Sequence, residues 1–148
     1  MKIKVLDGSN YFRGLLLLLR KDHLITEPEV ELMRHVGKAL GFEKEFCNNA
    51  IKEILENEYI SDIPPEFSST DLAKKFIRDG LAFSFSDGPM HSQEEEWLRS
   101  TALINHVDLQ WFQNEIQNQS PVPFSPIVLE VDGITVTHSW APVDESQT

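Results

Sequence analysis

The chain has 148 residues, the length of one ordinary domain, and its 13 Lys and Arg against 24 Asp and Glu give a formal net charge of −11. This negative charge repels phosphate backbones and anionic lipid surfaces, so it argues against a nucleic-acid-binding protein and against membrane docking by bulk charge. Hydrophobic residues make up 41% of the sequence, which excludes disorder over the whole chain. We expect an affinity for cations or for basic partners.

The cysteine content and the N-terminal sequence indicate the compartment. A single cysteine, Cys47, excludes an intramolecular disulfide framework and a cysteine-rich zinc site. The first ten residues contain no apolar stretch typical of a signal peptide. The five leucines of 15–19 are followed by charged residues, and a membrane span needs about 20 apolar residues, so this run predicts a buried helix. We therefore predict a cytoplasmic protein without membrane insertion.

Helix start signals recur along the first 119 residues. Thr26 and Glu29 have the spacing of a capping box, and Ser92 and Glu95 belong to a second stretch of this kind, Ser92-Gln93-Glu94-Glu95. Gly41 is a typical stop for a helix at its C-terminal end. Together with the apolar periodicity, these signals predict six helices at about residues 11–21 (capped by Ser9 or Asn10), 26–41, 43–58, 70–85, 92–104 and 108–116.

The pattern changes after Gln119. Residues 120–126 contain three prolines and are typical of an extended linker. The β-branched runs 127–131 and 134–138 are joined by Asp132-Gly133, which predicts a β-hairpin. A lone hairpin is marginally stable, so we expect it to pack on the helices, on residues 3–6 or on another subunit. The predicted fold is mainly α, with a helical domain over 1–119 and the linker, hairpin and tail of 120–148 packed on it.

An internal repeat relates the two halves of the helical part. A shift of 65 residues places Arg13 on Arg78, Asp22 on Asp87, Glu29 on Glu94, Glu31 on Glu96 and Arg34 on Arg99. Apolar positions also match without a gap. The sequence therefore predicts a duplicated bundle in which each half contains a helix, an acidic turn, a helix and a shorter helix.

The two acidic turns are candidate metal sites. Each half places an Asp at the end of one helix and a Glu in the first turn of the next, as Asp22 with Glu29 and as Asp87 with Glu94. Two converging carboxylates offer the oxygen ligands that Ca²⁺ and Mg²⁺ prefer. The alternative is structural, because acids in a first helical turn stabilise the helix dipole and an Asp next to Gly and Pro is common in turns.

These units resemble the TerB-like (tellurite-resistance TerB) superfamily. The resemblance rests on Lys21-Asp22-His23-Leu24-Ile25 with Glu29, on Ser86-Asp87-Gly88-Pro89-Met90 with Glu94, and on the segment Val36 to Phe42 with its Leu-Gly pair. It covers about residues 10–116 and does not reach the predicted hairpin. The resemblance implies an all-helical duplicated fold, a divalent metal held by Asp22, Glu29, Asp87 and Glu94, and a link to tellurite and stress resistance.

Three functions remain open from the sequence. No nucleophile elbow, phosphate loop or His-Glu-x-x-His motif occurs, which favours a non-catalytic helical module that binds a protein partner, with a possible Ca²⁺ or Mg²⁺ in its acidic turns. The second is a metal-dependent hydrolase that uses His23, Asp87 and His91 with a bound water. The third is a structural subunit, such as a homodimer joined through its hairpin.

Overall fold

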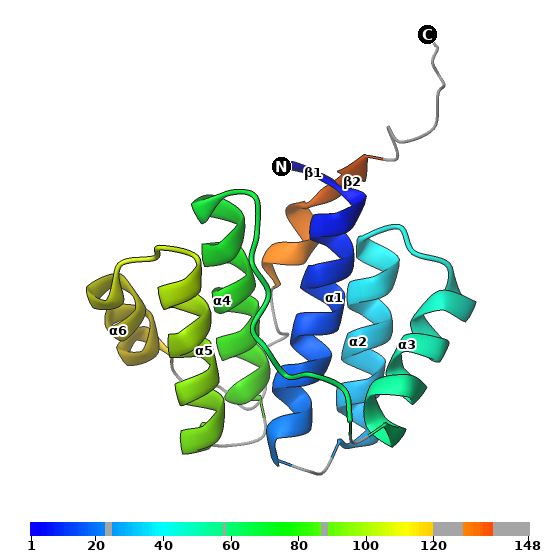
Figure 1. The fold of residues 1–148 in the computed structure, drawn as a ribbon, viewed down its shortest axis with the longest axis horizontal. Helices are drawn as coiled ribbons and strands as arrows, with labels where there is room; N and C mark the ends of the chain where they lie inside the picture. Colours follow the sequence, from blue (N-terminus) through cyan, green and yellow to red (C-terminus); the bar gives the residue numbers. More distant parts are fainter. Residues whose placement is uncertain (23–24, 58, 87–88, 120–128, 138–148) are drawn as a thin grey trace, which may run out of the picture.

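The computed structural model describes residues 1–22, 25–57, 59–86, 89–119 and 129–137, and this part of the chain is mainly helical (Figure 1). The mainly α fold predicted from the sequence is confirmed. In chain order the elements are β1 (Lys2–Lys4), α1 (Val5–Leu19), the 3₁₀ helix η1 (Arg20–Asp22), α2 (Glu27–Ala39), α3 (Lys44–Glu56), α4 (Thr70–Ser84), α5 (Ser92–Ile104), α6 (Leu109–Asn118), the 3₁₀ helix η2 (Glu130–Gly133) and β2 (Thr135–Thr137).

Most of the predicted helix starts are confirmed by their caps. The Thr26 hydroxyl accepts the Glu29 N–H at 3.4 Å, and the Thr26 N–H donates to Glu29 Oε1 at 2.9 Å, which completes the capping box of α2. Asp108 caps α6 as expected. In α5 the cap is His91, one residue before the predicted Ser92, and the His91 N–H donates to Glu94 Oε1 at 3.1 Å.

The first helix begins earlier than predicted. Ser9 and Asn10 do not cap it, because α1 already starts at Val5. Tertiary contacts favour the extra turn: the Ser68 N–H donates to Asp7 Oδ1 at 3.1 Å, and the Ser68 hydroxyl donates to the other oxygen of this buried carboxylate. Gly8 allows close packing here, since a Cβ atom in its place would lie 2.9 Å from Val136 Cγ2.

The predicted C-terminal hairpin is wrong within the described residues. Glu130–Gly133, which should have ended its first strand and formed its turn, is the 3₁₀ helix η2. β2 pairs in parallel with β1, with Ile3 opposite Val136. The β-branched run 134–138 does contain a strand, and of the contacts expected for it the one with residues 3–6 is observed. Ile3 and Val136 together bury their side chains on the helices.

The helical repeat is confirmed by the element boundaries. The shift of 65 residues carries α1 onto α4 and α2 onto α5 with both ends matched, and it carries the start of α3 onto the start of α6. Burial follows the same shift. Buried Met33, Cys47 and Leu40 correspond to buried Leu98, Phe112 and Asn105.

Even the helix stops are duplicated. Gly41 has φ 79° and His106, its counterpart 65 residues later, has φ 58°. In both halves the following residue completes the stop, with Phe42 N–H to Gly37 O at 2.9 Å and Val107 N–H to Ala102 O at 2.8 Å. The left-handed conformation turns the chain so that the following N–H groups can bond the last helix carbonyls. His106, which is exposed, adopts this conformation although a side chain disfavours it.

Helix α1 forms the centre of the fold. It packs against α2 and α4 and also contacts α3 and α5 (Figure 1). All five residues of 15–19 are buried, as predicted from the leucine run. Among the described residues no helix is both long and apolar enough to cross a membrane.

Candidate functional site

Both glutamates of the predicted metal sites are buried in the first turn of a helix, where they bond the cap residue. Glu29 is 5% exposed and Glu94 is 3% exposed, and each carboxylate accepts the backbone N–H of its own cap residue, Thr26 or His91. The Thr26 hydroxyl donates a further hydrogen bond to Glu29. These contacts account for the acidic residues at both positions through helix capping.

The structure does not describe the side chains of the two aspartates of the prediction. Asp22 ends η1, but its side chain is not among the described ones, and both Asp87 and His23 fall in undescribed positions. Within the described residues no group of three or more His, Cys, Asp or Glu side chains could hold a metal ion. The metal site at Asp22, Glu29, Asp87 and Glu94 therefore stays a prediction.

The structure places Ser86, the described residue that precedes the second turn, beside the first turn at a groove. The groove has a volume of about 880 Å³, and its lining includes Thr26 and Pro28 from the first turn and Ser86 from the start of the second. Leu32 from α2 and Leu129 from the C-terminal segment add apolar walls. A space of this size, largely apolar with a few polar groups, is typical of ligand sites.

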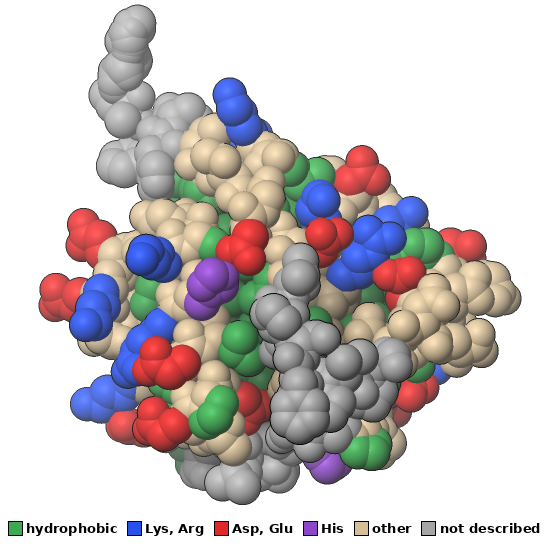
Figure 2. Space-filling model, turned by 180° about the vertical axis from the view of Figure 1, so that it is seen from behind, with side chains coloured by type: hydrophobic (Ala, Val, Ile, Leu, Met, Phe, Trp, Pro, Cys, Tyr) green, Lys and Arg blue, Asp and Glu red, His purple; other side chains and the backbone are tan. Residues whose placement is uncertain are grey.

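Charged groups stand at one side of this groove. His35 lines it, and His35 Nε2 lies 2.7 Å from Asp132 Oδ1, with both side chains about half exposed. Glu31 also lines the groove and pairs with Arg34 on the next turn of α2. Seen from behind, the molecule exposes acidic, basic and hydrophobic side chains interspersed over its surface, with histidine among them (Figure 2).

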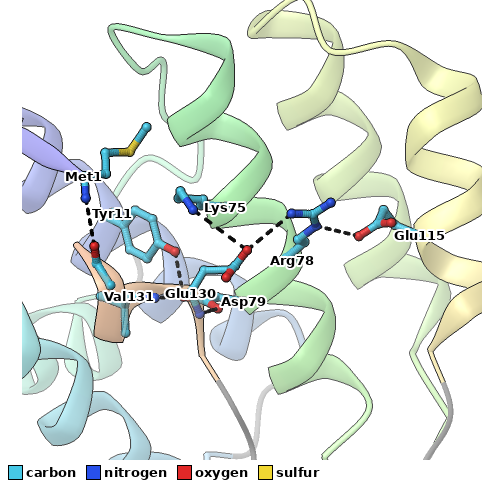
Figure 3. Close-up of polar contacts among 9 residues, drawn as sticks. Met1, Tyr11, Lys75, Arg78, Asp79, Glu115, Glu130 and Val131 are labelled. Atoms are coloured by element: carbon cyan, nitrogen blue, oxygen red, sulfur yellow. Dashed lines mark hydrogen bonds and ion pairs between the residues drawn. The ribbon is translucent and has the colours of Figure 1, made fainter.

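One wall of the groove is held in place by a buried carboxylate, Asp79 of α4 (Figure 3). Its Oδ1 accepts the Glu130 N–H at 2.6 Å, and its Oδ2 accepts the Val131 N–H at 3.0 Å and the Tyr11 hydroxyl at 2.6 Å. The Asp79 carboxylate, which belongs to α4, thus accepts the first two N–H groups of η2. These bonds fix the path of the chain from Leu129 to Asp132.

Ion pairs lie between the Asp79 contact and the protein surface. Glu130 lies 3.3 Å from Arg78 Nη1 and 4.0 Å from Lys75 Nζ, and Arg78 Nε lies 2.7 Å from Glu115 of α6 (Figure 3). These pairs are partly exposed, so each adds little by itself. Together they link α4, α6 and η2.

Burial decides the ionisation of the Asp79 cluster. It raises the pKa of Asp79 from 3.8 to about 6, although the hydrogen bonds from Tyr11, Glu130 and Val131 favour the carboxylate. Burial, followed by the charge of Asp79, raises the pKa of the Tyr11 hydroxyl far above its ordinary value. At neutral pH the carboxylate accepts three hydrogen bonds and Tyr11 remains a donor.

Sequence reasoning did not single out Asp79 or Tyr11. A signal was present, because Asp79 lies between Phe76 and Leu81 on a helix whose neighbouring residues are mostly apolar. An acid at such a position needs buried donors. The donors are backbone N–H groups 51 and 52 residues away, and helical periodicity carries no information about them.

Comparisons with protein-family models, with curated proteins and with solved structures find no match for this chain. The TerB-like resemblance therefore stays a prediction from the residues, and the candidate site is defined by its own geometry.

The raised pKa of Asp79 predicts a pH dependence of stability. Between about pH 4 and pH 6 the folded protein binds the proton more tightly than the unfolded chain, so the free energy of unfolding falls as the pH rises. The full change in the pKa of Asp79 corresponds to roughly 3 kcal/mol of unfolding free energy. Asp79→Asn keeps the side-chain size and removes this titration. In urea unfolding, we expect the wild type to lose about 2 kcal/mol of stability relative to the variant between about pH 4.5 and pH 7.5.

All other titrating groups are shared by the two proteins, so the difference between them isolates Asp79. A difference that stays constant with pH, or that favours the wild type more as the pH rises, would contradict the raised pKa.

Proposed function

We propose that this chain is a non-catalytic binding module whose groove receives a basic, partly apolar segment of a protein partner. The observation that supports the proposal is the groove beside the first turn, where Pro28, Leu32 and Leu129 provide apolar contacts. The Glu31 carboxylate belongs to its lining, and the Asp132 carboxylate contacts His35 of the lining. Apolar area supplies affinity and the charges favour one class of partner. The overall charge of −11 acts in the same direction over a longer range.

The hydrolase alternative has less support. Of its three residues, His23 and Asp87 lie outside the described part of the chain. His91 is exposed and is the cap residue of α5, where its backbone N–H serves Glu94. Homodimerisation also stays a prediction, but the hairpin expected to join the subunits is replaced among the described residues by the pairing of β2 with β1.

Binding of a basic peptide tests the proposed function. The probe is a short peptide of leucine and lysine, and the comparison peptide carries glutamate in place of lysine. We expect the lysine peptide to bind and the glutamate peptide not to bind. Glu31→Lys should weaken binding about tenfold, equivalent to about 1.4 kcal/mol, because it reverses a charge at the groove. The measurement is fluorescence anisotropy of the labelled peptides.

Glu45→Lys is the matched control, since it makes the same change in net charge at an exposed position of α3 outside the groove. Equal weakening by the two variants would mean that bulk charge, and not the groove, recognises the peptide. Equal affinity for the lysine and glutamate peptides would also overturn the proposal.

The second part of the proposal is a divalent cation at the acidic turns, as the TerB-like resemblance implies together with tellurite or stress resistance. The Tm of the wild type is measured in Ca²⁺, Mg²⁺, Mn²⁺ or Zn²⁺ and compared with the Tm in chelator. We expect one of these ions to raise the Tm, because a ligand that binds the folded state stabilises it. Glu29→Gln keeps an oxygen for the cap and should abolish the rise, whereas Glu31→Gln should keep it. No rise in any of the four ions would remove this part of the proposal.

A further inference from the structure

A second cleft, on the other side of α1, is separate from the groove. It lies between the C-terminal end of α1 with η1, the connection from α3 to α4, and α5, and its volume is about 730 Å³. Leu17, Ile60, Ile63 and the indole of Trp97 provide apolar lining. All of these residues belong to the described part of the chain.

Arg20 brings an unusual charge to this cleft. It lines the cleft, and its Nη1 atom is buried without a hydrogen-bond partner among the described residues. A guanidinium nitrogen that has lost its water and gained no acceptor is costly, more so than a neutral group. Nη1 itself is inaccessible, so an anion in the cleft contacts the guanidinium through its other nitrogens and offsets the cost of its burial there.

The neighbouring charges leave Arg20 available. Lys21 donates to the Asp62 carboxylate and is the main cause of the lowered pKa of that group, to which the charge of Arg20 adds a smaller contribution, so the principal partner of Asp62 is Lys21. The Trp97 indole N–H donates to the Asp62 carbonyl at 2.7 Å, which fixes the wall of the cleft. Glu96 is the remaining carboxylate of the lining, and it is exposed and forms no ion pair with Arg20.

We propose that this cleft binds a small organic anion that has a carboxylate and an apolar body. The carboxylate pairs with the Arg20 guanidinium, whose planar fork matches two carboxylate oxygens. The apolar body lies against Trp97 and the isoleucines. A protein with a net charge of −11 attracts few free anions by bulk charge, so this recognition depends on the local guanidinium and on apolar burial. The site is independent of the basic-peptide groove.

Binding is tested on the full chain with phenylacetate, with its neutral analogue phenylacetamide and with inorganic phosphate. The readout is the NMR signal of the Trp97 indole N–H, which reports on the cleft wall. Phenylacetate should shift the signal saturably, while phenylacetamide and phosphate should bind at least tenfold more weakly. Comparable binding of phenylacetamide would exclude recognition of the charge, and preferential binding of phosphate would exclude recognition of the apolar body.

Variants assign the anion contact to Arg20. Arg20→Gln should weaken phenylacetate binding at least tenfold, and Arg13→Gln, on the preceding helix α1 and outside the cleft, should leave it unchanged. Glu96→Gln should strengthen binding severalfold, because it removes one of the carboxylates of the lining. If Arg20→Gln fails to fold, the affinities of Glu96→Gln for phenylacetate and of the wild type for the three ligands still test the proposal. Unchanged binding in a folded Arg20→Gln variant would overturn the proposal.

Discussion

The architecture depends on one buried carboxylate. Asp79 is 1% exposed, and it accepts hydrogen bonds from the Tyr11 hydroxyl and from two backbone N–H groups of η2. An unpaired carboxylate at this depth would be strongly destabilising, so the position is tolerable only while the C-terminal segment is docked. Burial of Val131 and Ile134 beside the cluster adds apolar contacts to the same docking. The β1–β2 pairing and one wall of the groove follow from it.

This contact occurs in one half only, because the two repeats carry different residues at the equivalent position. The position equivalent to Asp79 in the first half is Gly14, where a Cβ atom would lie 2.8 Å from the ring of Phe76. The first repeat therefore uses its position for close packing of α1 on α4, and the second uses it to attach the C-terminal segment. Arg78 and Arg13 differ in the same way: Arg78 pairs with Glu115 and Glu130, and Arg13 lies outside both sites. The two halves share a framework and differ in their polar attachments.

Local signals predicted the helices because their causes are local. The Thr26–Glu29 capping box and the Asp108 cap act within one turn of the chain, so the sequence reveals them. The start of α1 and the fate of residues 129–137 depend on Ser68 meeting Asp7 and on η2 meeting Asp79. Those contacts join residues 51 to 61 positions apart, so they override the Asp132-Gly133 turn signal that indicated a hairpin.

The candidate sites also combine features with local causes and features that depend on distant contacts. Glu29 and Glu94 were predicted as acids of helix starts, and their caps are local. The groove required Leu129 and Ser86 to meet α2, and the cleft required Arg20 to meet the α3–α4 connection and α5. The repeat indicated that the two turns were related, but it could not place the groove between them.

The most direct measurement of the central contact is amide hydrogen exchange at Glu130 and Val131, observed by NMR in the wild type and in Asp79→Asn. If the carboxylate holds η2, both amides are protected in the wild type and exchange at least tenfold faster in the variant, while amides in the middle of α1 change much less. Equal exchange at Glu130 and Val131 in the two proteins would show that the C-terminal segment is held by other contacts and would contradict the role assigned to Asp79.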